Sequence, residues 1–178
     1  ENIYKMCDYG DELVIGIHEG KLRKLNKRKN ILTDVNAPEV HYKIIRDVAC
    51  FDDELWVGTQ SGVYVINELK NKISHIYNDP MCSYSLSDNQ IGRIYRDREN
   101  GIWIGTNLGG VNYCPQRGIE FTRHIPLSRP YTISSKRVRE LVEDEEGNIW
   151  VGTEDAGINI YDPHTGAFKK IGRDVGSK

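Results

Sequence analysis

The five-residue stretch Leu55-Trp56-Val57-Gly58-Thr59 recurs twice further along the chain, and this recurrence decides the fold. The copies are Ile102-Trp103-Ile104-Gly105-Thr106 and Ile149-Trp150-Val151-Gly152-Thr153, so successive tryptophans lie 47 residues apart. A weaker copy, Leu13-Val14-Ile15-Gly16-Ile17, lies 42 residues before the first and has valine in place of tryptophan. All three tryptophans of the 178-residue chain occupy this one repeat position. A repeat of this length indicates an architecture of stacked, similar units.

The surroundings of each copy predict four short strands in every unit. A strand precedes the motif, and a turn of residues such as Glu146-Gly147-Asn148 joins the two. Gly, Asn and Asp favour tight turns because they accept positive φ or bond their own backbone. A second apolar stretch follows the motif, and a short strand closes the unit. The predicted first strands are 3–8, 44–50, 91–97 and 138–144, and the closing strands are 31–35, 73–77, 121–125 and 168–171.

Four strands in 42 to 47 residues fit a β-propeller blade. A solenoid repeat usually has only one or two elements. The motif strand is apolar at consecutive positions, as expected for a strand buried on both faces between stacked blades. We therefore predict an all-β propeller of four four-stranded antiparallel blades without helices. The blades cover about residues 1–42, 43–86, 87–133 and 134–178 of a single domain.

The motif tryptophans are expected to fill the spaces between blades. The motif glycines are expected to let the neighbouring blade approach closely. These structural residues are Trp56, Gly58, Trp103, Gly105, Trp150 and Gly152.

Composition excludes several classes of function. The 24 basic and 26 acidic residues are well mixed, with a net charge of −2 and no basic stripe, so we expect no nucleic-acid partner. No apolar run approaches the roughly 20 residues of a membrane helix, so we expect no direct membrane contact from this segment.

Four cysteines, Cys7, Cys50, Cys82 and Cys114, follow no CxxC pattern. Their number would allow two disulfides in an oxidising compartment. The interpretation we favour is four separate thiols, packed as small apolar residues.

Two units resemble a known family, the two-component regulator propeller repeat. The first combines Ser85-Leu86-Ser87 with Asp97, Gly101-Ile102-Trp103-Ile104-Gly105-Thr106 and Gly109-Gly110-Val111. The second runs from Thr132-Ile133-Ser134 to Phe168 and contains Asp144 and the third motif copy. The unit around Trp56 matches less well, and the first only in outline. The departures are Val14 and Ile17 in the first motif, and Cys50 in place of the aspartate.

In this family, many such blades form the periplasmic sensor region of hybrid two-component regulators typical of Bacteroides. The resemblance implies recognition of a carbohydrate or oligosaccharide by an inner-membrane sensor protein. It implies that the histidine kinase and the DNA-binding output lie elsewhere in the parent. The family supplies no catalytic residue, ligand residue or cofactor for this segment, which we expect to be non-enzymatic.

The chain begins at a first strand and ends after a fourth. Three arrangements fit this phase: a closed four-bladed ring, an eight-bladed ring of two chains, or part of a longer propeller. We favour the last two, in which the end blades expose apolar faces that drive association. The expected partners are therefore a second copy, or the remaining blades of the parent chain, besides a glycan ligand.

Loops at one end of a propeller usually carry the ligand site, because a rigid scaffold positions them. Amide, acid and imidazole groups there could bond sugar hydroxyls. Tyrosine rings could stack on sugars, and an arginine could pair with a sulfate or uronate. The candidates between second and third strands are His18, Glu19, Gln60, Asn107, Glu154 and Asp155; those between blades are Tyr84, Arg129 and Tyr131. The alternative is that these are ordinary loop residues.

Two other functions compete with ligand sensing. One is a propeller lyase, for which His18-Glu19 is the best acid–base candidate. No histidine pair has metal-binding spacing, and no nucleophile motif occurs, so neither a metal nor a catalytic residue is predicted. The other is a scaffold that docks partners and binds no small ligand. Acidic clusters such as Asp52-Asp53 are interpreted as hairpin turns and not as calcium loops.

Overall fold

The computed structural model describes residues 3–17, 20–115, 122–128 and 130–171. Within these residues, sixteen strands form four separate four-stranded sheets, and each strand pairs antiparallel with the next along the chain. The first two sheets consist of β1 (Ile3–Tyr9), β2 (Glu12–Ile17), β3 (Lys21–Asn26), β4 (Ile31–Asp34), β5 (Ile45–Phe51), β6 (Glu54–Thr59), β7 (Gly62–Asn67) and β8 (Lys72–Ile76). The last two consist of β9 (Ile91–Arg96), β10 (Ile102–Thr106), β11 (Val111–Cys114), β12 (Thr122–His124), β13 (Val138–Glu143), β14 (Ile149–Thr153), β15 (Ile158–Asp162) and β16 (Ala167–Ile171).

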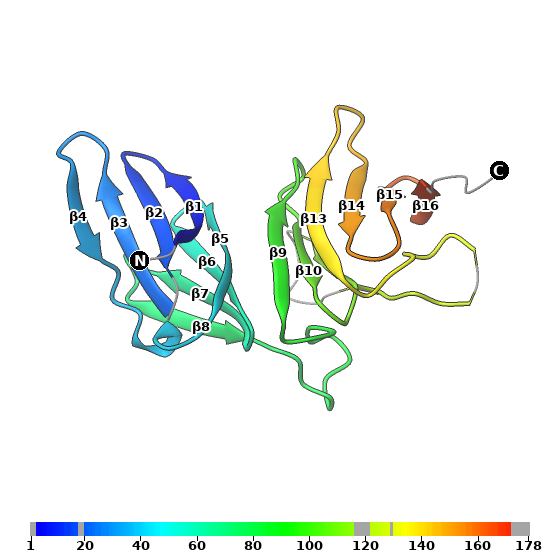
Figure 1. Cartoon of the computed structure of the whole chain (residues 1–178), viewed down its shortest axis with the longest axis horizontal. Coiled ribbons are helices and arrows are strands. Elements are labelled where there is room, and N and C mark those ends of the chain that lie inside the picture. Colours follow the sequence, from blue (N-terminus) through cyan, green and yellow to red (C-terminus); the bar gives the residue numbers. More distant parts are fainter. Residues whose placement is uncertain (1–2, 18–19, 116–121, 129, 172–178) are drawn as a thin grey trace.

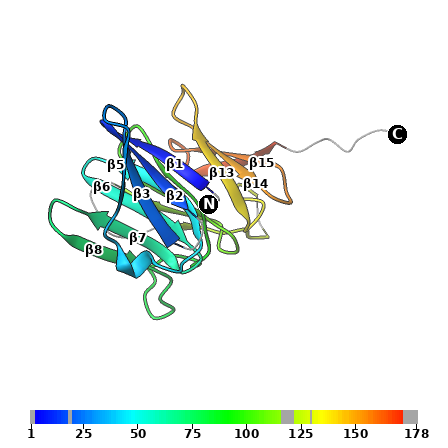
Figure 2. The same cartoon turned by 60° about the vertical axis from the view of Figure 1, so that its left-hand side comes forward.

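The four sheets stand side by side as an arc (Figure 1). Their first strands pack in sequence, β1 on β5, β5 on β9 and β9 on β13. The fourth strands β4, β8 and β16 lie toward the outside (Figure 1), and the turned view shows β8 at the edge of the molecule (Figure 2). This arrangement confirms the predicted all-β class of four-stranded propeller blades.

The expectation that the chain has no helix is wrong at one place. Pro38–Val40 form a single 3₁₀ turn in the connection between the first two sheets. The fixed φ of Pro38 suits the first position of such a turn. Val40 is fully buried there, so the turn closes over the core between these sheets.

The motif glycine allows each sheet to approach the next one. A Cβ atom on Gly58 would lie 2.6 Å from Cγ2 of Ile91, and one on Gly105 would lie 2.5 Å from Cγ1 of Val138. Gly16 is in the same situation, 2.8 Å from Cγ2 of Val48. These distances are too short for any side chain, so the aliphatic residue of the next sheet occupies the notch.

An aspartate at the end of the first strand holds the motif tryptophan in the last two sheets. Trp103 Nε1 donates to Asp97 Oδ2 at 2.7 Å, and Trp150 Nε1 donates to Asp144 Oδ2 at the same distance. Each aspartate also accepts a backbone N–H from its own turn, for example from Gly101 at 2.7 Å. Hydrogen bonds, led by that from Trp150, lower the pKa of Asp144 to about 2. One carboxylate thus fixes both the turn and the indole.

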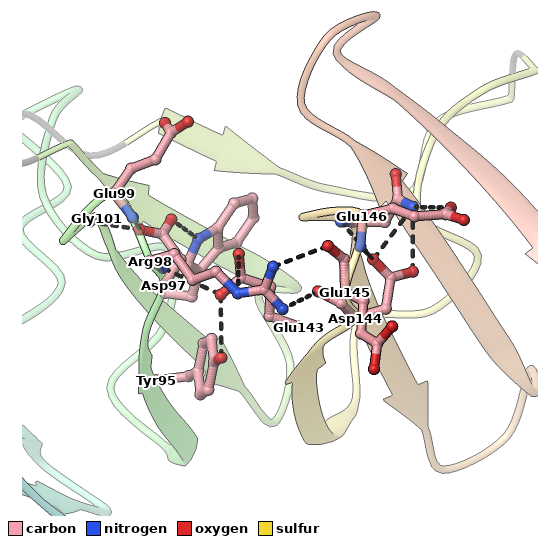
Figure 3. A network of polar contacts seen from close by, with 11 residues as sticks. Tyr95, Asp97, Arg98, Glu99, Gly101, Glu143, Asp144, Glu145 and Glu146 are labelled. Atoms are coloured by element: carbon pink, nitrogen blue, oxygen red, sulfur yellow. Dashed lines mark hydrogen bonds and ion pairs between the residues drawn. The ribbon is translucent and has the colours of Figure 1, made fainter.

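Polar contacts join the third and fourth sheets near these turns (Figure 3). The Arg98 guanidinium donates to the carbonyl oxygens of Asp144 and Glu145, and its backbone N–H donates to Glu143 Oε2 at 3.0 Å. The Tyr95 hydroxyl bonds the same Glu143 oxygen at 3.2 Å. Because several donors meet one buried carboxylate, the two sheets are held at a fixed offset.

The preference for four separate thiols is wrong for one pair, because Cys7 and Cys50 form a disulfide. These residues lie on β1 and β5, the first strands of adjacent sheets, with Cα atoms 6.2 Å apart. That separation is within the usual range for a disulfide. Cys82 and Cys114 remain thiols.

We predict that the Cys7→Ser/Cys50→Ser variant is less stable by about 2–4 kcal/mol, because the disulfide closes a long loop in the unfolded chain. Urea unfolding with and without reductant measures this loss. Thiol titration of the unreduced, denatured wild type should find two of the four cysteines reactive. Four reactive thiols in protein purified from an oxidising compartment would contradict the pairing.

We also predict that Asp97→Ala lowers the free energy of unfolding by about 1–3 kcal/mol, because it leaves the buried Trp103 N–H without its acceptor. Asp97→Asn keeps an oxygen acceptor and should lose less. Chemical denaturation of the three proteins tests this order. Equal stability of Asp97→Ala and wild type would show that the bond does not fix the indole.

Candidate functional site

The loops between second and third strands lie at the same end of each sheet as the connections between sheets, because successive strands alternate in direction. Two predicted site residues on these loops bond within the chain. Gln60 Oε1 accepts the backbone N–H of Ile44. Asn107 Nδ2 donates to Gln90 Oε1 at 3.2 Å, and its backbone N–H donates to the Gln90 carbonyl at 2.8 Å. Both residues thus tie their loop to the start of their own sheet.

The remaining predicted residues are not gathered into one site. Glu154 forms an ion pair with Arg139 on the neighbouring first strand, and Asp155 beside it is exposed. Tyr131 is 73% exposed and lies over a hollow of the fourth sheet that Phe168 also lines. His18, Glu19 and Arg129 lie outside the described residues. Tyr84 lies elsewhere, at a cavity between two sheets.

This inter-sheet cavity, between the second and third sheets, has a volume of about 600 Å³. Ligand pockets commonly measure about 300–1,000 Å³ and combine apolar walls with a few polar groups. Its apolar and aromatic lining is Trp56, Ile76, Tyr77, Tyr84, Ile102, Cys114 and Pro115. Its polar lining is Ser74, His75, Asp79, Cys82, Ser85 and Asn100.

Strand register explains why the cavity lies here. At the next interface Trp103 packs against Tyr113, His124 and Tyr161, with ring centroids 4.4, 6.2 and 5.2 Å away. These three rings fill the space between the third and fourth sheets.

The corresponding positions around Trp56 carry smaller side chains. Pairing across the sheets makes Val65 equivalent to Tyr113, Ile76 to His124 and Cys114 to Tyr161. Replacement of three rings by small side chains leaves space beside the indole. Trp103 is accordingly 2% exposed, whereas Trp56 is only half-buried and lines the cavity.

Aromatic rings hold β8, the outer strand of the second sheet, in place. The His75 ring stacks on Tyr64, with centroids 4.2 Å apart, and its Nε2 lies 2.7 Å from the Ser61 carbonyl oxygen. Tyr77 also packs against His75, with ring centroids 5.0 Å apart. Because Tyr64 belongs to the core between the first and second sheets, this stack supports β8 from the face opposite Ile76, which lines the cavity.

The loop that carries Tyr84 is also fixed. The Ser85 hydroxyl donates to the Asp79 carbonyl at 2.8 Å and accepts the Asp79 N–H at 2.9 Å. The Arg123 guanidinium from β12 donates to the Ser85 carbonyl and hydroxyl, each at 2.9 Å. Tyr84 itself is 56% exposed, so its ring is available at the rim of the cavity.

Burial shifts the pKa of two titratable side chains of the third sheet. Burial raises the pKa of the Cys114 thiol, which keeps it protonated and weakly nucleophilic. Burial also lowers the pKa of His124, the histidine at the filled interface. Within the described part of the chain, no three His, Cys, Asp or Glu side chains gather as a metal site. No described helix is long and apolar enough to cross a membrane.

Sequence reasoning placed Tyr84 among the candidates but missed the rest of the cavity. Trp56 was assigned only a structural position, and Tyr77 and Asp79 were not singled out. A signal was present, because aligned units put Cys114 where the fourth unit has Tyr161. A small residue at a position that elsewhere carries a ring indicates a local loss of packing.

Several solved structures have a similar fold. The extracellular domain assigned to the hybrid two component system BT3049 of B. thetaiotaomicron has a TM-score of 0.78 and 18% identity, over 96% of this chain and 24% of that one. The extracellular domain of BT4673 from the same organism has a TM-score of 0.74 and 18% identity, over 95% of this chain and 25% of that one. PorZ, a surface component of the type-IX secretion system of Porphyromonas gingivalis, has a TM-score of 0.73 and 15% identity, over 98% of this chain and 28% of PorZ. The chain spans about a quarter of the length of these proteins.

No curated protein has a sequence that matches this chain significantly. Two segments, residues 85–108 and 132–155, match the family described as two component regulator propeller. Each segment contains the connection into a sheet, its first strand and its motif strand. Parts of the third and fourth sheets are therefore similar to repeats of the two component regulator propeller family.

Proposed function

We propose that this chain is a ligand-recognising segment of an extracytoplasmic two-component sensor, and that it binds a carbohydrate in the inter-sheet cavity. The observation that carries the proposal is the half-buried indole of Trp56, which borders the cavity where three rings of the next interface are replaced. An aromatic face beside hydroxyl, amide and carboxylate groups suits a sugar ring, which has apolar faces and polar edges.

The charge of the lining narrows the ligand class. Asp79 contributes a carboxylate, and the described lining holds no Lys or Arg side chain. A neutral sugar avoids placing an anion beside Asp79, whereas a sulfated or uronate sugar would meet like charge. We therefore propose a neutral oligosaccharide. The earlier hypothesis of an arginine-paired acidic sugar depends on Arg129, which lies outside the described residues.

The loops between second and third strands fit a scaffold better than a binding site. Gln60, Asn107 and Glu154 all bond groups of their own chain, so their polar atoms are partly occupied. The protonated Cys114 thiol supports a binding role for the cavity over covalent catalysis. The competing hypothesis of a lyase depends on His18 and Glu19 alone.

The proposed location is the periplasm, as part of an inner-membrane sensor. The Cys7–Cys50 disulfide supports it, because disulfides persist in oxidising compartments and are rare in the cytosol. The similar structures of BT3049 and BT4673 are extracellular domains, which points the same way. A histidine kinase and its output domain would belong to other parts of the parent protein.

We predict that neutral oligosaccharides quench or shift the tryptophan fluorescence of the chain and that Cys114→Tyr abolishes this response. The substitution supplies the ring that Tyr161 provides at the next interface, so it should fill the cavity while the fold is kept. A panel of neutral, uronate and sulfated oligosaccharides, titrated against both proteins, is the measurement.

Two further variants sharpen this test. Tyr84→Ala should weaken binding by about tenfold, the effect of losing roughly 1.4 kcal/mol of contact. Tyr42→Ala removes an 88% exposed tyrosine from the connection before the second sheet and should leave binding unchanged. If no panel member binds, or if Cys114→Tyr binds as well as wild type, the cavity is not the ligand site.

A further inference from the structure

A second hollow adjoins the inter-sheet cavity. This turn-end hollow has a volume of about 430 Å³ and is bordered by the two hairpin turns β5–β6 and β7–β8 of the second sheet and the first hairpin turn of the third, β9–β10. Three residues, Trp56, Asn100 and Ile102, line both spaces. The inter-sheet cavity and the turn-end hollow therefore meet beside the Trp56 indole.

The turn-end hollow is lined by charged groups of both signs. They are Asp52, Asp53, Glu54, Lys70 and Arg96. Carboxylates accept hydrogen bonds, and ammonium and guanidinium groups donate them, so both the donor and the acceptor function of a hydroxyl group can be satisfied there. An anionic ligand would meet three carboxylates, and a cationic ligand would meet two cations. This mixture suits a neutral unit that is rich in hydroxyl groups.

Arg96 is held in place across the interface between the second and third sheets. Its Nη1 donates to Asp52 Oδ2 at 2.7 Å, and its guanidinium lies over the Phe51 ring, 5.0 Å from the centroid. Among the described residues, Asp52 is the only hydrogen-bond partner of this group, which has five N–H donors. A guanidinium that is fixed in position and keeps unused donors is preorganised to bond the hydroxyl groups of a ligand.

Asn100 lies where the two spaces meet. Its backbone has a positive φ of 63°, a conformation that asparagine tolerates in turns, and its N–H donates to the Asp97 carbonyl at 3.0 Å. Its side-chain amide bonds none of the described residues, so one donor group and one acceptor group face the junction. The aligned turn of the fourth sheet has Gly147 at this position, with a φ of 86°. The turn therefore forms without an amide here.

Polar groups at the next interface are used by the chain itself (Figure 3). A hollow of about 420 Å³ lies at the equivalent turn end of the third and fourth sheets. Strand pairing makes Glu143 the equivalent of Arg96, but Glu143 accepts hydrogen bonds from Tyr95 and Arg98 of the preceding sheet. The Arg98 guanidinium is bound to two carbonyl oxygens of the fourth-sheet turn. These groups hold sheets together, whereas Arg96 keeps donors for a ligand.

We propose that the site has two subsites that meet at Trp56, and that it binds a neutral oligosaccharide chain lying across both; this inference rests on the function proposed above. One sugar unit occupies the inter-sheet cavity, and the next occupies the turn-end hollow. Arg96 donates to hydroxyl groups of the second unit, and the Asn100 amide bonds the chain where it passes from one subsite to the other. Arg96 and Asn100 are therefore the residues that select a chain over a single sugar.

The dependence of affinity on sugar length tests this arrangement. The full chain is titrated, with tryptophan fluorescence as the signal, against neutral gluco-, manno-, galacto- and xylo-oligosaccharides of increasing length, starting from the monosaccharides. In the series that binds, affinity should rise by at least about tenfold from the monosaccharide to the shortest member that reaches both subsites, because two linked contacts form as one binding event. It should then level off, because further units lie outside the two spaces.

Two variants remove the second subsite and leave the first intact. Arg96→Gln should weaken binding of the longer sugars by about tenfold, as expected for the loss of a hydrogen bond from a charged donor, and leave monosaccharide binding unchanged. Asn100→Gly should have the same selectivity, and its turn should be kept because glycine adopts positive φ without strain. Arg28→Gln is the matched control: it breaks an arginine–aspartate pair of the first sheet, Arg28 with Asp11 at 3.1 Å, and should change neither affinity.

Cys114→Tyr separates this inference from the proposal on which it rests, because it fills the inter-sheet cavity and should abolish binding at every length. If no sugar binds, or if Cys114→Tyr binds as well as wild type, both the cavity and the second subsite are wrong. If Cys114→Tyr abolishes binding but monosaccharides bind as tightly as longer sugars, the second subsite alone is wrong. The same conclusion follows if Arg96→Gln and Asn100→Gly weaken all lengths equally, or none.

Discussion

The rest of the structure depends on the absence of a side chain at one repeat position. Because Gly16, Gly58 and Gly105 leave a notch, the first strand of each following sheet can place an aliphatic residue against the motif strand. Any side chain there would meet that residue closer than 3.0 Å. Close approach at the inner strands, repeated from sheet to sheet, produces the arc and buries the motif strand on both faces.

Each interface is then completed in its own way. Between the third and fourth sheets, Asp97 holds Trp103 and three rings surround it. In the second sheet the aspartate position is Cys50, so Trp56 Nε1 bonds Glu54 at 3.2 Å, and the cysteine instead links to the first sheet. One substitution therefore exchanges a turn-stabilising carboxylate for a covalent link between sheets.

The sequence was enough to predict the fold because the repeat is visible in single positions such as Trp103 and Gly105. The candidate site was less predictable, because its cavity depends on Val65, Ile76 and Cys114, which come from different strands and different sheets. The disulfide was also hard to predict from the sequence. In the aligned repeat Cys50 corresponds to Asp8 and not to Cys7, so only the stagger between sheets brings the two thiols together.

The residues opposite the motif glycine alternate in charge from sheet to sheet, in the order Lys5, Asp47, Arg93 and Glu140. These charges serve to specify the order of the sheets more than to stabilise them. Asp47 is 1% exposed, and burial raises its pKa despite the Ile94 N–H that it accepts at 2.7 Å and the nearby Lys5 and Arg93. A buried carboxylate of this kind costs desolvation that its partners only offset. The contact between a motif glycine and an aliphatic residue of the next sheet is the same at each interface. By itself, this contact would therefore let almost any sheet follow any other. A cation beside a cation would be rejected, so the charges restrict which sheet can be the neighbour of which.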